Sequence, residues 1–256
     1  PDALVHGEGP GEACPVAGDL LMKKLIAVVL FAFPGLAFAS GASVHLDTAP
    51  VNLNDKSSLQ RGAQIFVNHC LNCHSAQYMR YGRLTDLGLT EAQIKENLIL
   101  TGEKVGDPMT TTLAAKDGKE WFGVNPPDLS LVARSRGSDW LYTYMRSFYK
   151  DPAAKSGWNN TVFPNVGMPH VLWEYQGDQS FKADDHGGGK LTLDRPGKLP
   201  PAEYDRYVGD LVNFLTYLGE PARTKRVQIG IVVMFFLAAF FVLTLLLKKE
   251  YWKDVR

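Results

Sequence analysis

The chain has 256 residues, of which 45% are apolar and 21% charged, and its 27 basic side chains balance its 27 acidic ones. This composition excludes a disordered chain and a fibrous one, and the length suffices for one sizeable domain with additional segments. The average conceals two strongly apolar segments, one near each end.

The N-terminal apolar segment has the layout of a secretory signal peptide. Lys23-Lys24 precedes nine apolar residues, and the sequence Ala-Phe-Ala that follows fits a cleavage site. Nine apolar residues are too few to span a bilayer, although an uncleaved anchor is the alternative. We therefore expect residues 22–39 to be a signal peptide and the mature chain to begin near Ser40. Residues 1–21, which show no periodicity, are predicted to be an upstream extension outside the fold.

The C-terminal apolar segment is long enough to cross a membrane. Residues 227–247 contain no charge and are flanked on both sides by Lys and Arg. As a helix rising ~1.5 Å per residue, this stretch reaches ~30 Å, the thickness of the hydrocarbon core. The expected organisation is a periplasmic domain over 40–222, an anchor with its basic flank over 223–247, and a cytoplasmic tail over 248–256. The chain would then be a single-pass protein of a bacterial inner membrane.

The stretch FVNHCLNCHSAQ places Cys70, Cys73 and His74 within five residues. Such a cluster is typical of a redox disulfide, of half a zinc site, or of a covalently bound haem. A thioredoxin-like disulfide would need a βαβ pattern around the cysteines. Structural zinc would need four ligands, and the mature chain has no further Cys to supply them. A haem uses all three residues, since the two thiols bond its vinyl groups and the imidazole ligates its iron. The motif therefore predicts one haem c.

The residues before this motif are predicted to form a helix. Ala63, Phe66 and Cys70 recur at helical spacing, and Ser57 or Ser58 is the candidate N-cap. The thiols would thus follow a helix that buries one apolar face.

The sixth iron ligand decides between an electron carrier and a haem enzyme or sensor, because a six-coordinate iron has no open position for a substrate. Met168 lies in the Pro- and Gly-bounded loop FPNVGMPHV, where an extended segment can place a thioether over a haem. Met109 and His170 are the alternatives. An open sixth site would instead indicate a haem enzyme or an anchored haem sensor.

Further helices are predicted for TEAQIKENLIL and SDWLYTYMRSFY, and the Gly-rich stretch over 177–200 is predicted to be a surface hairpin or loop. Near the end of the exported region, PAEYDRYVGDLVNFLTYLGEP carries a single apolar stripe that predicts a helix. The residues of the stripe are Tyr204, Tyr207, Val208, Leu211, Val212, Leu215 and Leu218.

Several stretches in a fixed order resemble the cytochrome c1 family over nearly all of residues 45–256. They are SLQRGAQIFVNHCLNCHSAQYMRYGRL, NPPDLSLVARSRG, FPNVGMPHVL and VNFLTYLGEPARTKRVQIG. The resemblance implies a mainly α fold, with a class I cytochrome c-like haem domain, inserted loops and one C-terminal transmembrane helix. It also implies an electron-transfer subunit of a ubiquinol–cytochrome c oxidoreductase (bc1) complex, which is not an enzyme by itself.

The resemblance also implies residue roles and partners. Met168 would be the axial ligand opposite His74, Pro126 and Pro127 would help to wall the haem, and Arg134 or Arg136 would lie near a propionate. The partners would be the cytochrome b and Rieske iron–sulfur subunits of a dimeric complex and a soluble c-type cytochrome. Residues 40–222 hold 21 acidic and 18 basic side chains, a slight excess that suits a basic soluble partner.

Overall fold

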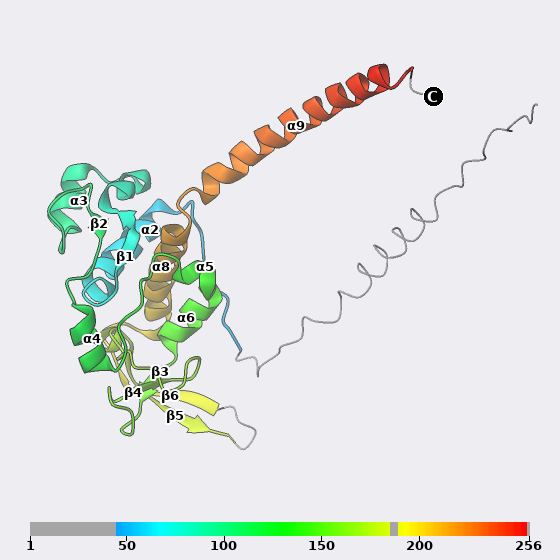
Figure 1. The fold of residues 1–256 in the computed structure, drawn as a ribbon. Coiled ribbons are helices and arrows are strands. Elements are labelled where there is room, and N and C mark those ends of the chain that lie inside the picture. Colours follow the sequence, from blue (N-terminus) through cyan, green and yellow to red (C-terminus); the bar gives the residue numbers. More distant parts are fainter. Residues whose placement is uncertain (1–44, 185–188, 255–256) are drawn as a thin grey trace, which may run out of the picture. The chain divides into compact units, whose positions relative to one another are not determined.

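The computed structural model describes residues 45–184 and 189–254, so the predicted upstream extension and signal peptide lie outside the described residues. About half of the described chain is helical, and the helices outweigh the strands (Figure 1). The helices are α2 (Lys56–Ile65), α3 (Glu91–Asn97), α4 (Ala115–Phe122), α5 (Val132–Ser135), α6 (Ser138–Arg146), α7 (Trp173–Gln176), α8 (Pro201–Gly219) and α9 (Arg223–Tyr251), with a π-helical turn η1 (Phe66–Cys70) and a 3-10 helix η2 (Tyr81–Leu87).

The strands of the described residues form three small antiparallel pairs, β1 (Ala76–Arg80) with β2 (Pro108–Met109), β3 (Phe148–Lys150) with β4 (Trp158–Asn160), and β5 (Gly177–Ala183) with β6 (Gly189–Pro196). The last pair is the hairpin predicted for the Gly-rich stretch. The side chains of β6 are mostly exposed and those of β5 mostly half-buried, whereas β4 is buried throughout.

Helices α2 and α8 pack closely enough to require a glycine at position 62. A Cβ added to Gly62 would lie 2.1 Å from the backbone oxygen of Asp210 and 2.6 Å from the Cβ of Phe214. On the same pair of helices, the Arg61 guanidinium binds the Asp210 carboxylate at 2.6 Å. Because η1 follows α2 directly, the packing of α2 on α8 also positions η1 and its last residue, Cys70.

The N-terminus of α2 corrects one sequence-based expectation. Asp55, and not Ser57 or Ser58, is the N-cap, and its carboxylate accepts the backbone N–H of Ser58 at 3.0 Å. The helix starts at Lys56, so both serines lie inside its first turn. Any of the three side chains could cap a helix, which is why the pattern alone did not decide between them.

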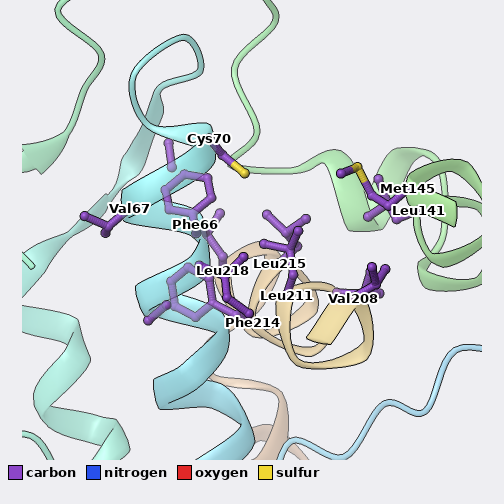
Figure 2. Packing of buried hydrophobic residues seen from close by; sticks show 14 of the residues in the cluster. Phe66, Val67, Cys70, Leu141, Met145, Val208, Leu211, Phe214, Leu215 and Leu218 are labelled. Carbon is purple, nitrogen blue, oxygen red and sulfur yellow. The ribbon is translucent and has the colours of Figure 1, made fainter. Parts of the chain in front are cut away.

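The core is built on the apolar stripe of α8, all of which is buried except the partly exposed Tyr207. Phe66 of η1 and Phe214 of α8 meet with ring centroids 5.7 Å apart. In Figure 2, Leu211 and Leu215 of α8 lie between Cys70 on one side and Met145 of α6 on the other. Burial of this stripe contributes to the hydrophobic stabilisation of the domain.

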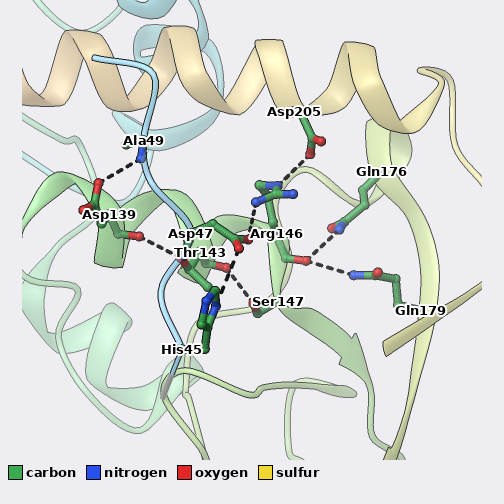
Figure 3. A network of polar contacts seen from close by, with 10 residues as sticks. All are labelled: His45, Asp47, Ala49, Asp139, Thr143, Arg146, Ser147, Gln176, Gln179 and Asp205. Carbon is green, nitrogen blue, oxygen red and sulfur yellow. Dashed lines mark hydrogen bonds and ion pairs between the residues drawn. The ribbon is translucent and has the colours of Figure 1, made fainter. Parts of the chain in front are cut away.

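A polar network around Arg146 ties the first described segment to the core (Figure 3). Its guanidinium contacts the carboxylates of Asp47 and Asp205, each at 2.6 Å. Its backbone carbonyl accepts N–H groups from Gln176 at 2.9 Å and from Gln179 at 3.1 Å. One residue of α6 thereby connects the segment that contains Asp47 with α8, α7 and β5.

Helix α9 is long and apolar enough to cross a membrane over Lys225–Tyr251, by length and composition. Its described side chains are exposed along its whole length. The helix continues beyond position 247, into the segment predicted to be the tail. Only residues 220–222 separate it from α8.

Candidate functional site

One apolar cavity brings together most of the sequence-predicted site residues. Cys70, Cys73, His74 and Met168 all line it. The remaining lining comes from α4 to α6, the loop after β4 and α8, and includes Phe122, Val124, Pro126, Pro127, Leu129, Val132, Arg136, Trp140, Leu141, Tyr144, Met145, Phe163, Val166, Leu211 and Leu215. Cys70 and Met168, which are 98 positions apart in the sequence, therefore face the same space.

The two cysteines are set by a tight turn that follows η1. The backbone N–H groups of Cys73 and His74 both donate to the carbonyl of Cys70, at 3.0 and 2.8 Å. The two cysteines form no disulfide with each other, and burial raises the pKa of the Cys70 thiol to about 12 and that of the Cys73 thiol above its ordinary value. Burial therefore favours the protonated form of both sulfurs.

His74 is held in one tautomer by the backbone of Pro127, a residue that also lines the cavity. Its Nδ1 lies 2.7 Å from the carbonyl oxygen of Pro127, and since a carbonyl only accepts, Nδ1 carries the proton. The lone pair of Nε2 is then available to a metal, as in many metal-binding histidines. Burial lowers the pKa of His74 and keeps the imidazole neutral. This role of the Pro127 carbonyl went unrecognised in the sequence.

Met168 lies in a loop that is fixed by two asparagine side chains. The Oδ1 atom of Asn160 accepts the backbone N–H groups of Val162 and Phe163, at 2.9 and 3.1 Å. The Oδ1 atom of Asn159 accepts that of Asn165 at 2.8 Å, where the backbone adopts a positive φ of 61°. Polar side chains thus substitute for regular secondary structure in this loop.

The sulfur of Met168 also has a side-chain partner. The phenolic hydroxyl of Tyr144, on α6, donates to Met168 Sδ at 3.4 Å. Tyr144 is buried, and this burial raises the pKa of its phenol, so the hydroxyl keeps its proton. Sequence analysis placed the neighbouring Met145 in an aromatic helix but did not single out Tyr144.

The two alternative sixth ligands lie elsewhere. Met109 is fully buried in β2, opposite Ala76 of β1, and does not line the cavity. His170 is also buried outside the cavity, stacked on the Phe148 ring with centroids 4.9 Å apart. Burial lowers the pKa of His170 to about 4.

The two predicted arginines differ in position. Arg136 lines the cavity, and its Cζ atom lies 5.2 Å from the centroid of the Trp140 ring and 5.8 Å from that of Phe163. Arg134 does not line the cavity, and its stem lies against Gly219 at the end of α8. Only Arg136 is therefore placed to meet an acidic group at the cavity.

Comparisons with known proteins identify the family of the chain. The sequence profile of the Cytochrome C1 family matches residues 47–120 and 101–255. The chain belongs to the cytochrome c1 family. A cytochrome c1 of Allochromatium vinosum is 49% identical over 243 residues, covering 91% of this chain and 100% of the relative. A cytochrome c1 of Rhodospirillum rubrum is 27% identical over 270 residues, covering 87% and 95%.

A further relative carries a different name. A protein of Nitrosomonas europaea named "Ammonia monooxygenase gamma subunit" is 50% identical over 235 residues, covering 92% of this chain and 99% of the relative. The chain is thus about as similar to this protein as to the cytochrome c1 of Allochromatium vinosum.

As a cytochrome c1 family member, the chain carries a single covalently bound haem c and takes part in electron transport. Cytochrome c1 is an electron-transfer subunit of the bc1 complex, together with cytochrome b and the Rieske protein. The cavity fits a haem by its chemistry, since an apolar lining surrounds two thiols, a neutral imidazole and a thioether. Among the residues that the structure describes, no three His, Cys, Asp or Glu side chains gather into another metal-binding group.

Proposed function

We propose that this chain is a membrane-anchored electron carrier that accepts electrons from a Rieske iron–sulfur protein and passes them to a soluble c-type cytochrome. The observation that carries the proposal is the convergence of Cys70, Cys73, His74 and Met168 on one apolar cavity. When bound there, the haem supplies reversible one-electron exchange. A fully ligated iron leaves no position for a substrate, which favours electron transfer over catalysis.

Each residue has a defined task in this proposal. Cys70 and Cys73 would form the covalent links, and His74, oriented by the Pro127 carbonyl, would ligate the iron through Nε2. Met168 provides the sixth ligand through its sulfur. Arg136 is the candidate partner of a propionate. His/Met ligation with an apolar surrounding favours the reduced iron relative to bis-nitrogen ligation.

The haem domain is proposed to have a class I cytochrome c-like fold with inserted loops, over residues 40–222. It would lie on the periplasmic side of a bacterial inner membrane, with α9 as the anchor and a short cytoplasmic tail. The signal-peptide pattern over 22–39 and the long apolar helix support this orientation. The cytochrome b and Rieske subunits of a dimeric bc1 complex are the proposed membrane partners.

The assembly can be tested directly, because a relative is named as a subunit of a different complex. Affinity purification of the tagged protein from detergent-solubilised native membranes should recover a b-type cytochrome and an iron–sulfur protein. Recovery of ammonia monooxygenase subunits instead would replace the proposed partners and leave the haem-carrier role in place.

A matched pair of leucine substitutions tests the axial ligand. Met168→Leu keeps the volume of the side chain but removes the sulfur, so the iron should bind carbon monoxide and its potential should fall. The long-wavelength absorption band that marks thioether ligation of ferric haem should disappear. Met109→Leu, a buried control outside the cavity, should retain the band and the potential. The reverse pattern would assign the ligand to Met109.

If neither substitution changed the spectrum, and the unmodified protein already bound carbon monoxide, the carrier proposal would fail. An open sixth site would then favour a haem enzyme or a sensor. Pyridine haemochrome spectra measured on the same samples would confirm that each variant contains the same amount of haem.

A further inference from the structure

The phenol of Tyr144 occupies a position from which it can influence the iron without touching it. Its hydroxyl donates to the sulfur of Met168 at 3.4 Å, and the ring itself lines the cavity. A thioether sulfur is a weaker hydrogen-bond acceptor than a carbonyl oxygen, so this hydrogen bond alone would not fix the position of the tyrosine hydroxyl. The contact therefore depends on how firmly the ring is held in place.

Three contacts hold Tyr144. Its ring stacks on Trp140 with centroids 4.8 Å apart and planes inclined by 10°, and it meets Phe148 edge-on at 5.0 Å. Its backbone carbonyl accepts the Nδ2 group of Asn160 at 2.8 Å. Because Asn160 also fixes the loop of Met168, the donor and the acceptor of the sulfur contact are both tied to one side chain.

We propose that Tyr144 is a positioning residue that directs its hydroxyl at the axial sulfur and thereby raises the potential of the haem. This inference rests on the proposed role of Met168 as the sixth ligand. A donated O–H withdraws electron density from the sulfur, which then donates less to the iron. The ferric form, which carries the higher positive charge, depends more on that donation and is destabilised more than the ferrous form.

The same argument fixes the sign of a second property. A sulfur that loses electron density to a hydrogen bond binds ferric iron less tightly, so a competing ligand such as imidazole displaces it more readily. If Tyr144 were merely a packing residue, its hydroxyl would matter only by steadying the loop, and losing it would loosen Met168. The two roles therefore predict opposite changes in the affinity for imidazole.

The test is Tyr144→Phe in the full-length haem-loaded protein, with Tyr142→Phe as the matched control. The substitution keeps the ring that contacts Trp140 and Phe148 and removes only the hydroxyl. Tyr142 lies on the same helix, is equally buried, and contacts the Arg146 guanidinium through its ring face at 4.5 Å. It does not line the cavity.

In Tyr144→Phe, the equilibrium between the oxidised and reduced forms should shift towards the oxidised form by up to about tenfold, equivalent to about 59 mV for a one-electron couple. The long-wavelength band should persist, and imidazole should bind several-fold more weakly. Tyr142→Phe should match the unmodified protein in both measurements. Redox titration and imidazole titration of the same preparations provide the two numbers.

An unchanged potential in Tyr144→Phe would overturn the proposal, and so would a tighter binding of imidazole. Both results would leave Met168 as the ligand, provided the band persists. A band that is missing from the unmodified protein would overturn the ligation itself. The failure of this inference is thus distinguishable from the failure of the proposed function.

Discussion

The two sides of the proposed haem cavity are built in different ways. On the cysteine side, Cys70, Cys73 and His74 occupy one turn, and two backbone hydrogen bonds to the Cys70 carbonyl define their geometry. On the Met168 side, the loop has no regular structure, and the side chains of Asn159 and Asn160 fix it.

The cysteine side is therefore built from residues that are neighbours in the sequence. The Met168 side is built from residues that are neighbours only in the folded structure. The cysteine turn needs few residues outside itself, apart from the Pro127 carbonyl that orients His74. The Met168 loop depends on β4, which carries both asparagines, and on Tyr144 of α6. We therefore expect substitutions on the first side to affect the attachment of the haem, and distant substitutions on the second side to affect its ligation.

The largest effect is expected from removing the covalent links. In the double variant Cys70→Ala, Cys73→Ala, no thioether bond can form, so the haem-stained band of the mature protein should vanish from denaturing gels. An immunoblot of the membrane fraction should still detect the chain, because α9 is unchanged. Staining that survived in the double variant would place the covalent attachment elsewhere.

A smaller effect on stability is expected at the other side of the cavity. Asn160→Ala leaves two backbone N–H groups of the loop and the carbonyl of Tyr144 without this partner, in a place where Asn160 itself is fully buried. The free energy of unfolding, measured by urea denaturation, should fall by about 3 kcal/mol.

The matched control is Asn97→Ala, which removes an exposed side chain that donates to the Gln93 carbonyl at 2.9 Å in α3. This change should stay within about 0.5 kcal/mol of the unmodified protein. The band of thioether ligation should weaken in Asn160→Ala and not in the control. Equal losses of stability in the two variants would contradict the dependence of the loop on Asn160.

The smallest effect is a pH dependence at Asp151. The Nδ2 group of Asn159 donates to its carboxylate at 2.8 Å and the N–H of Ala153 at 3.0 Å, and these bonds lower the pKa of Asp151. A lowered pKa in the folded state means that this stabilisation is fully present above about pH 4, the ordinary range of Asp, and is lost as the pH falls through the lowered value.

The stability difference between the unmodified protein and Asp151→Ala should therefore be constant near neutral pH and shrink under acid conditions. Urea midpoints measured over a pH series provide the comparison. A difference that stayed constant to the lowest pH at which the protein folds would show that the charge of Asp151 does not support Asn159.

The same division explains what the sequence could predict. Local signals were sufficient for the apolar stripe of α8 and for the helix α3. They also marked the Gly-rich stretch as a hairpin or loop, and β5 and β6 form a hairpin there. The cysteine motif likewise predicted its own chemistry, because its spacing matches the cofactor. Each of these features depends on residues that are close in the chain.

Features that depend on distant partners were not predictable. The Arg146 network joins Asp47 to Asp205, and the His74–Pro127 hydrogen bond links residues 53 positions apart. Met109 was an open candidate because its burial against Ala76 depends on a strand pairing that no local pattern indicates. The Tyr144–Met168 contact is of the same kind.

The connection between α8 and α9 has a mechanical consequence. Residues 220–222 can extend over no more than about 11 Å, and the Arg226 guanidinium pairs with the Glu220 carboxylate across this joint. If α9 spans a bilayer, this short connection would keep the preceding domain close to the membrane surface. The domain would then lack the range of motion that a long flexible linker allows. An electron-transfer partner would then have to reach the domain close to the membrane surface.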